Sequence, residues 1–121
     1  MADFNNLRKV SELFTDKRAA TQTFPVPRNV SQTAKKLLGW RYTKEVVGMS
    51  DWRWKRVALL AKGKPVSLLI VQQINKVSPE TLRSRPVNPD KPWADPMYVA
   101  YLSCGGRAGI EWAKRITNGN T

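Results

Sequence analysis

Apolar residues near the start of the chain recur every three to four positions and predict an amphipathic helix over residues 4–14. The stretch 15–28 that follows carries two prolines and no sustained period, so it is predicted to be a loop or an extended arm. A second, shorter helix is predicted over residues 30–38. Asn29 can cap its first turn, and Gly39 lies just past its end.

The middle and the C-terminal part of the chain are predicted to form a mostly antiparallel sheet with one closing helix. Tryptophan, tyrosine, threonine and valine favour a strand over residues 40–47, and the apolar run 66–74 is typical of a buried strand. Tyrosines alternate with aliphatic residues over 97–103, which predicts a further strand. Residues 110–117 have a helical pattern and are predicted to close the fold, with the large indole of Trp112 in the core.

The segment 52–61 allows two interpretations. Ser50 or Asp51 could cap a helix there and Gly63 could end it, whereas a strand would continue through the following Lys-Gly-Lys-Pro turn into the next strand. Residues 56–71 are locally similar to the Gly-Lys-Pro-Val hairpin of Phd/YefM-type antitoxins, a resemblance that implies two paired strands and does not extend to the rest of the chain. We favour the strand.

Together these elements predict one α+β domain over residues 1–121, with N-terminal helices, a mostly antiparallel sheet of 3–4 strands and a C-terminal helix on one face. A helix at 52–61 would instead give three helices followed by two strands, which resembles a winged helix with an overlong wing. Residues 78–96 contain five prolines and predict a long loop, in which Trp93 is suited to anchor a protein partner. The last residues, 118–121, are predicted to be frayed.

The charge of the chain is strongly positive. It has 21 Lys and Arg against 9 Asp and Glu, which gives a formal net charge of +12. A surplus of this size attracts polyanions, so we expect nucleic acid as the partner, with an acidic protein as the alternative. The longest apolar stretch, 57–74, is interrupted by lysines and a proline, so no membrane partner is expected.

The sequence contains no histidine and a single cysteine, Cys104. The missing histidine excludes Ser/His/Asp and Cys/His nucleophiles and the ordinary zinc sites, so we expect no catalytic residue, no metal and no cofactor. Cys104 cannot form an intramolecular disulfide and is expected to be a buried structural thiol. The N-terminal sequence lacks the pattern of a signal peptide, and a cytoplasmic, virion or host-intracellular location is therefore expected.

The stretch 40–64 interleaves cationic side chains with aromatic rings. Nucleic-acid binding uses both types, because cations neutralise phosphates while flat rings stack on exposed bases. The glycine-rich turn 103–109 matches neither a Walker A motif nor GxGxxG, and it adds only Arg107 as a phosphate contact. The predicted nucleic-acid-binding residues are Trp40, Arg41, Tyr42, Lys44, Trp52, Arg53, Trp54, Lys55, Arg56, Lys62, Lys64 and Arg107.

This pattern predicts a non-enzymatic protein that binds nucleic acid, with single strands preferred over duplexes. The small size and basic charge are typical of viral, phage or plasmid accessory factors. One alternative is an assembly protein whose basic face binds an acidic partner. The sequence is also compatible with a homo-oligomer. A histidine-free ribonuclease, similar in chemical logic to RelE-type toxins, is a weaker alternative because no residue is an obvious general base.

Overall fold

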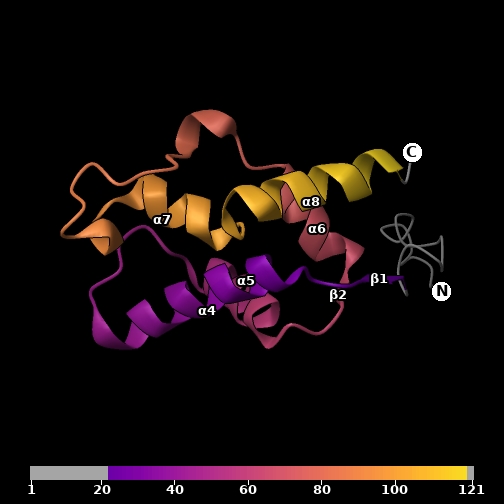
Figure 1. Ribbon diagram of the computed structural model, residues 1–121, viewed down its shortest axis with the longest axis horizontal. Helices are drawn as coiled ribbons and strands as arrows, with labels where there is room; N and C mark the ends of the chain where they lie inside the picture. The colour runs from indigo at the N-terminus through magenta and orange to yellow at the C-terminus, as the bar shows by residue number, and fades with distance from the viewer. Residues whose placement is uncertain (1–21, 120–121) are drawn as a thin grey trace, which may run out of the picture.

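The computed structural model describes residues 22–119, and these are predominantly helical (Figure 1). The elements in chain order are β1 (Thr23–Phe24), α4 (Arg28–Thr43), α5 (Asp51–Lys62), β2 (Val66–Ser67), α6 (Leu68–Asn75), the 3-10 turns η1 (Pro79–Thr81) and η2 (Pro92–Ala94), α7 (Pro96–Ser103) and α8 (Gly106–Gly119). In Figure 1, α7 and α8 follow one another along the top, with α4 beneath them. The predicted helix over 4–14 and the first part of the arm, 15–21, lie outside the described residues.

The predicted α+β fold is wrong. Of the expected strand 66–74, only Val66 and Ser67 are extended, and the rest forms α6. The expected strand 97–103 is α7, and the expected strand 40–47 begins as the last turn of α4. Within residues 22–119 the only sheet is the antiparallel pair of β1 and β2, which also contradicts the winged-helix alternative.

The burial pattern explains why apolar runs predicted as strands are helices. In α6 the buried side chains are Ile70, Val71 and Ile74, a spacing that places them on one side of a helix. In α7 the buried residues include Val99 and Leu102, three positions apart. A short apolar run has too few positions to distinguish the helical repeat from the alternation of a strand. The prediction therefore relied on composition, which favoured strands.

The segment 52–61 forms α5 rather than the favoured strand. The side-chain oxygen of Ser50 caps the helix by accepting a hydrogen bond from the backbone N–H of Arg53 at 3.2 Å. Gly63 ends it in the left-handed conformation, with φ at 72°. The hairpin implied by the local resemblance to Phd/YefM-type antitoxins is absent, because residues 56–71 form the end of α5, a turn, β2 and the start of α6.

The other two predicted helices are confirmed but are longer than expected. The helix predicted over 30–38 begins at Arg28 and runs through Gly39 to Thr43, and its N-cap is Pro27 rather than Asn29. The helix predicted over 110–117 is α8, which extends further at both ends. The missed helix α7 has clear start signals: the Asp95 carboxylate accepts from the backbone N–H groups of Met97 and Tyr98, and proline follows at the first helical position.

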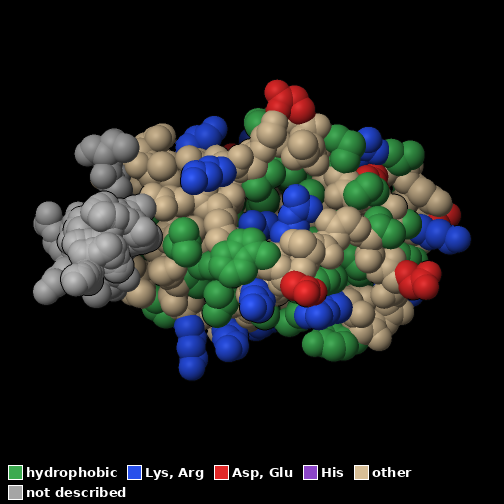
Figure 2. All heavy atoms as spheres, turned by 180° about the vertical axis from the view of Figure 1, so that it is seen from behind, with side chains coloured by type: hydrophobic (Ala, Val, Ile, Leu, Met, Phe, Trp, Pro, Cys, Tyr) green, Lys and Arg blue, Asp and Glu red, His purple; other side chains and the backbone are tan. Residues whose placement is uncertain are grey.

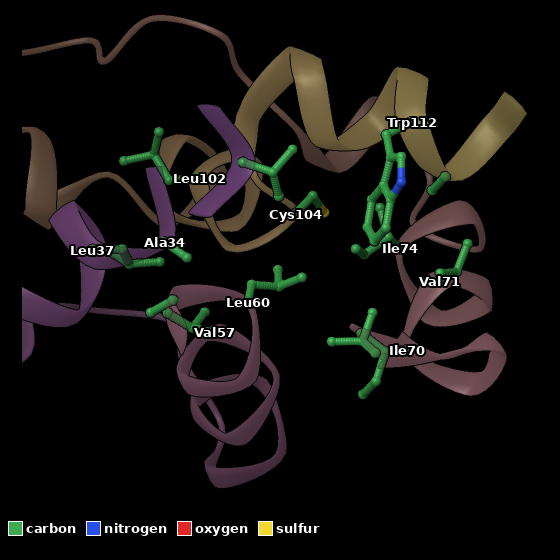
Figure 3. Close-up of a cluster of buried hydrophobic side chains, with 14 of the residues drawn as sticks. Ala34, Leu37, Val57, Leu60, Ile70, Val71, Ile74, Leu102, Cys104 and Trp112 are labelled. Carbon is green, nitrogen blue, oxygen red and sulfur yellow. The ribbon is translucent and has the colours of Figure 1, made fainter. Parts of the chain in front are cut away.

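The five helices of residues 22–119 all contribute to one hydrophobic core. Figure 3 shows Leu37 of α4, Leu60 of α5, Ile74 of α6, Leu102 of α7 and Trp112 of α8 in the same cluster. Burial of such a side chain stabilises the fold by about 1.5–3 kcal/mol. Cys104 is also fully buried there, so the predicted core positions of the thiol and of the indole in the last helix are confirmed.

Helices α4 and α5 pack side by side in opposite directions. Near the start of α4, the Ser31 hydroxyl donates to the backbone carbonyl of Ala61, close to the end of α5, at 3.1 Å. Near the end of α4, the Arg41 guanidinium lies over the ring of Trp54, close to the start of α5, at 4.9 Å from the centroid. The turn 44–50 therefore joins the two helices at one end of the pair, and Lys62 and Lys64, on either side of Gly63, lie at the other.

Candidate nucleic-acid interface

Two aromatic rings are exposed where the turn 44–50 joins α4 to α5. Tyr42, in the last turn of α4, is 77% exposed, and Trp52, in the first turn of α5, is 52% exposed. Four exposed cations stand next to them in the sequence. We call this group the turn surface, and it comprises Arg41, Tyr42, Lys44, Trp52, Arg53 and Lys55. Figure 2 shows exposed hydrophobic side chains with Lys and Arg around them on the face opposite to that of Figure 1.

The turn itself is fastened to the segment before α7. The backbone N–H of Val47 donates to the carbonyl of Trp93 at 3.3 Å, and an Arg53 guanidinium nitrogen donates to the carbonyl of Gly48 at 2.9 Å. Gly48 has φ at 76°, and a Cβ there would lie 2.9 Å from the Cβ of Pro96. Only glycine allows both this conformation and this approach, so the turn is held against the start of α7.

The structure brings Trp93 to the residues predicted to bind nucleic acid. Its ring meets that of Trp40 edge to face, with the centroids 6.0 Å apart and an interplanar angle of 73°. The Lys44 ammonium lies 4.4 Å from the centroid of Trp93, and the Lys36 ammonium lies 5.2 Å from that of Trp40. The sequence had placed Trp93 on a separate loop for a protein partner, whereas here it adjoins the turn surface.

The loop 78–96 that carries Trp93 is organised by Asp95. As predicted, residues 78–95 contain no α-helix or strand, although they include η1 and η2, whereas Pro96 already begins α7. The Asp95 carboxylate pairs with Arg83 at 3.2 Å and accepts from the backbone N–H of Val87 at 2.9 Å, in addition to capping α7. Burial alone would raise the pKa of Asp95, but the backbone hydrogen bonds and the nearby guanidinium outweigh it and lower the pKa.

Two of the predicted binding residues are buried. Trp54 is only 8% exposed, and Arg56 is only 5% exposed. Arg56 donates from Nε to the carbonyl of Ser103 at 3.3 Å and from Nη2 to the hydroxyl of the same residue at 2.9 Å. Burial lowers the pKa of Arg56, the neighbouring Cys104 opposes this, and the positive charge of Arg53 adds to it. Burial therefore removes Trp54 and Arg56 from the accessible surface.

The remaining predicted cations lie elsewhere. Lys62 ends α5 and Lys64 follows it, both exposed at the end of the pair remote from the turn. Arg107 is exposed in the first turn of α8, where it forms an ion pair with Glu111 at 3.1 Å. The predicted set is therefore divided between the turn surface, Trp40 beside Trp93, the far end of α5, the start of α8 and the core.

The arrangement offers little for covalent or metal chemistry. Burial raises the pKa of the Cys104 thiol, although Arg56 and a hydrogen bond with Ser103 act in the opposite direction. The thiol is therefore protonated at neutral pH and is a poor nucleophile. Within the described part of the chain, no three His, Cys, Asp or Glu side chains gather into a group that could hold a metal ion.

Comparison of the chain with protein-family models, with curated proteins and with solved structures found no match. Among residues 22–119, no helix combines the length and the apolar character needed to cross a membrane. The geometry of the turn surface and its surroundings is therefore what bears on function.

Proposed function

We propose that this protein is a non-enzymatic nucleic-acid-binding protein that prefers single strands and binds them through the turn surface. The observation that carries the proposal is the exposure of Tyr42 and Trp52 among cations at one end of the α4–α5 pair. Large aromatic side chains are normally buried because they remove much apolar area from water. Rings left exposed beside cations are the combination that unpaired bases and phosphates require.

The cations of the turn surface support the proposal because no carboxylate of the described residues pairs with them, although Arg41 and Lys44 lie over rings and Arg53 donates to a carbonyl. Within the described residues, the ion pairs are Arg83 with Asp95 and Arg107 with Glu111, and neither includes a member of the turn surface. An exposed ammonium or guanidinium without a carboxylate partner can neutralise a phosphate and release a counterion. The preference for single strands follows from the rings, since the bases of a duplex already stack on each other.

An acidic protein partner is the second candidate, and a different observation favours it. On the outer side of α5, Leu59 is 40% exposed between Lys55 and Lys62, which lie one turn away on either side. An aliphatic side chain does not stack on bases. Leu59→Ser should therefore leave oligonucleotide affinity unchanged, whereas it should weaken a complex with an acidic protein that uses this face.

Fluorescence anisotropy with labelled oligonucleotides of about 12 nucleotides, single-stranded and duplex, DNA and RNA, tests the proposal. We expect tighter binding of single strands and a steep loss of affinity between about 50 and about 200 mM salt. The double variant Tyr42→Ala with Trp52→Ala should lower single-strand affinity at least about tenfold, by loss of stacking, with little effect on duplex.

The matched control is Val87→Ser, which changes an exposed hydrophobic residue (74% exposed) on the proline-containing loop. It should leave the affinity for every oligonucleotide unchanged. Absence of binding to all oligonucleotides at low salt, or binding that ignores salt, would contradict the proposed function.

A further inference from the structure

We propose that Trp40 and Trp93 form a base-stacking site for single-stranded nucleic acid, which Lys36 and Lys44 cover in the free protein. We call these two rings the tryptophan pair. The inference deepens the proposed function and rests on it, because it adds to the turn surface a second place where an unpaired base can bind.

The tryptophan pair and its two lysines form a row along one side of α4. Lys36, Trp40 and Lys44 are spaced by four residues, so the first two lie on one face of the helix and Lys44 continues it at the C-cap. Trp93 enters the row from η2, edge to face with Trp40 and under the Lys44 ammonium. The order of groups in space is therefore cation, ring, ring, cation.

Both rings of the tryptophan pair are partly exposed, and both lysines are exposed. The Lys44 ammonium lies over the ring of Trp93 at 4.4 Å from its centroid, and the Lys36 ammonium lies over the ring of Trp40 at 5.2 Å. Trp40 also packs against the hydrophobic core, so only part of its ring is open to solvent. An exposed, flexible lysine side chain therefore lies over one face of each ring.

A nucleotide can replace both lysine contacts at once. A cation over an exposed ring is a weak interaction, whereas an ammonium that contacts a phosphate forms a stronger charge-assisted contact and releases a counterion. When Lys44 moves to a phosphate, the face of Trp93 becomes free for the base of the same nucleotide. Lys44 thus contacts the phosphate and Trp93 stacks on the base of one nucleotide, so each side chain exchanges its present partner for a new one.

The support beneath Trp93 makes this platform rigid. Its carbonyl accepts from the backbone N–H of Val47, and Asp95, two residues further on, holds Arg83, Val87 and the start of α7. A ring held in place before binding loses little conformational entropy when a base stacks on it. This explains why a loop with so many prolines is fastened at the residue that follows η2.

The test compares a single-stranded oligonucleotide with an abasic strand of the same length, which keeps the phosphates and removes the bases. We expect the intact protein to bind the base-containing strand at least about tenfold more tightly. Trp93→Leu keeps an apolar side chain but removes the ring, so the ratio of the two affinities should fall about fivefold or more. Trp93→Phe should largely keep it. Circular dichroism checks that each variant retains its helices.

Lys44→Ala gives an independent test in case Trp93→Leu fails to fold. It uncovers the ring and removes one phosphate contact, so affinity for the abasic strand should fall more than affinity for the base-containing strand. The salt dependence should also flatten by about 0.7. Lys76→Ala, at an exposed lysine that follows α6, is the matched control and should leave the ratio unchanged.

The outcomes separate this inference from the proposed function. A ratio unchanged in folded Trp93→Leu and in Lys44→Ala would contradict the stacking site while leaving the turn surface, with Tyr42 and Trp52, in place. Equal affinities of the intact protein for the two strands would contradict stacking at both places. Failure of the intact protein to bind any oligonucleotide would overturn the proposed function as well.

Discussion

The two sides of α5 use the same residue types for different purposes. On the outer side, Trp52 and Lys55 are exposed. On the inner side, Trp54 lies under the Arg41 guanidinium, and Arg56 reaches Ser103 at the end of α7. The four lie within five consecutive residues, and the packing of α5 leaves one pair in water and buries the other. Composition identifies the segment as basic and aromatic, but only this packing distinguishes the exposed candidates for binding from the buried residues that support the fold.

Arg56 shows why a basic residue in such a segment can be structural. Its guanidinium is buried, and in the described part of the chain no carboxylate pairs with it. It is satisfied instead by the carbonyl and the hydroxyl of Ser103, where the chain passes from α7 toward α8. A buried cation with two acceptors contributes to the position of that link. It is not available to a phosphate.

The largest expected effect comes from exchanging the two tryptophans of α5 for alanine. Trp54→Ala should lower the free energy of unfolding by about 3–5 kcal/mol, because it opens a cavity under Arg41. Trp52→Ala should change it by no more than about 0.5 kcal/mol, because its ring is half exposed. Urea denaturation followed by circular dichroism measures both changes. Similar losses of unfolding free energy in the two variants would contradict the burial of Trp54 and the exposure of Trp52.

The two neighbouring cations of α5, Lys55 and Arg56, allow the same comparison of an exposed with a buried residue, with a smaller expected change in stability. Arg56→Ala should lower the free energy of unfolding by about 2 kcal/mol through a cavity and a lost charged hydrogen bond, and leave the affinity of the folded protein for single strands unchanged. Lys55→Ala should do the reverse, with unchanged stability and about fivefold weaker binding. Weakened binding by a fully folded Arg56→Ala protein would mean that the guanidinium reaches the ligand.

The smallest effect is a dependence on pH at the loop that carries Trp93. Because the folded state lowers the pKa of Asp95, the stability it contributes is present above the ordinary carboxyl pKa of about 3.9 and is lost as the pH falls through the folded-state value. Asp95→Asn can still cap α7 but cannot form the ion pair with Arg83. Urea denaturation at neutral and acidic pH should therefore show a smaller loss in the variant than in the intact protein. An equal loss of unfolding free energy in the two proteins would mean that ionisation of Asp95 contributes nothing to the pH dependence of stability.

The sequence predicted some of the elements that are marked by a sustained amphipathic repeat or by capping residues next to them. The helix α8 has a strongly amphipathic pattern, and Trp112, predicted to lie in the core because of its large indole, is buried. For α5, the capping serine and the closing glycine supported a helix, but an apolar run followed by a Lys-Gly-Lys-Pro turn favoured a hairpin instead. The Asp95-Pro96 pair marked the start of α7 and was passed over, because the alternation of tyrosines after it favoured a strand.

The site was harder to predict because it depends on contacts between distant segments. Lys36, Trp40 and Lys44 share one side of α4 only if the helix continues past Gly39, where the prediction ended it. Nothing in the local pattern around Trp93 indicates that its ring meets Trp40, more than fifty positions earlier. Such a contact follows from the packing of α7 and η2 against α4, which local signals do not determine.

The central claim is that a localised surface, rather than the net charge of +12, attracts nucleic acid. The most direct test removes three charges in two places. One variant replaces Arg41, Lys44 and Lys55 of the turn surface with glutamine, and the other replaces the exposed Lys76, Lys114 and Arg115. Affinity for a single-stranded oligonucleotide is then measured across a range of salt concentrations.

The first variant should lose at least about tenfold in affinity and flatten the slope of log K against log salt by about 2, while the second should change either quantity little. Equal losses from the two variants would contradict the account, because they would mean that diffuse charge alone binds the strand.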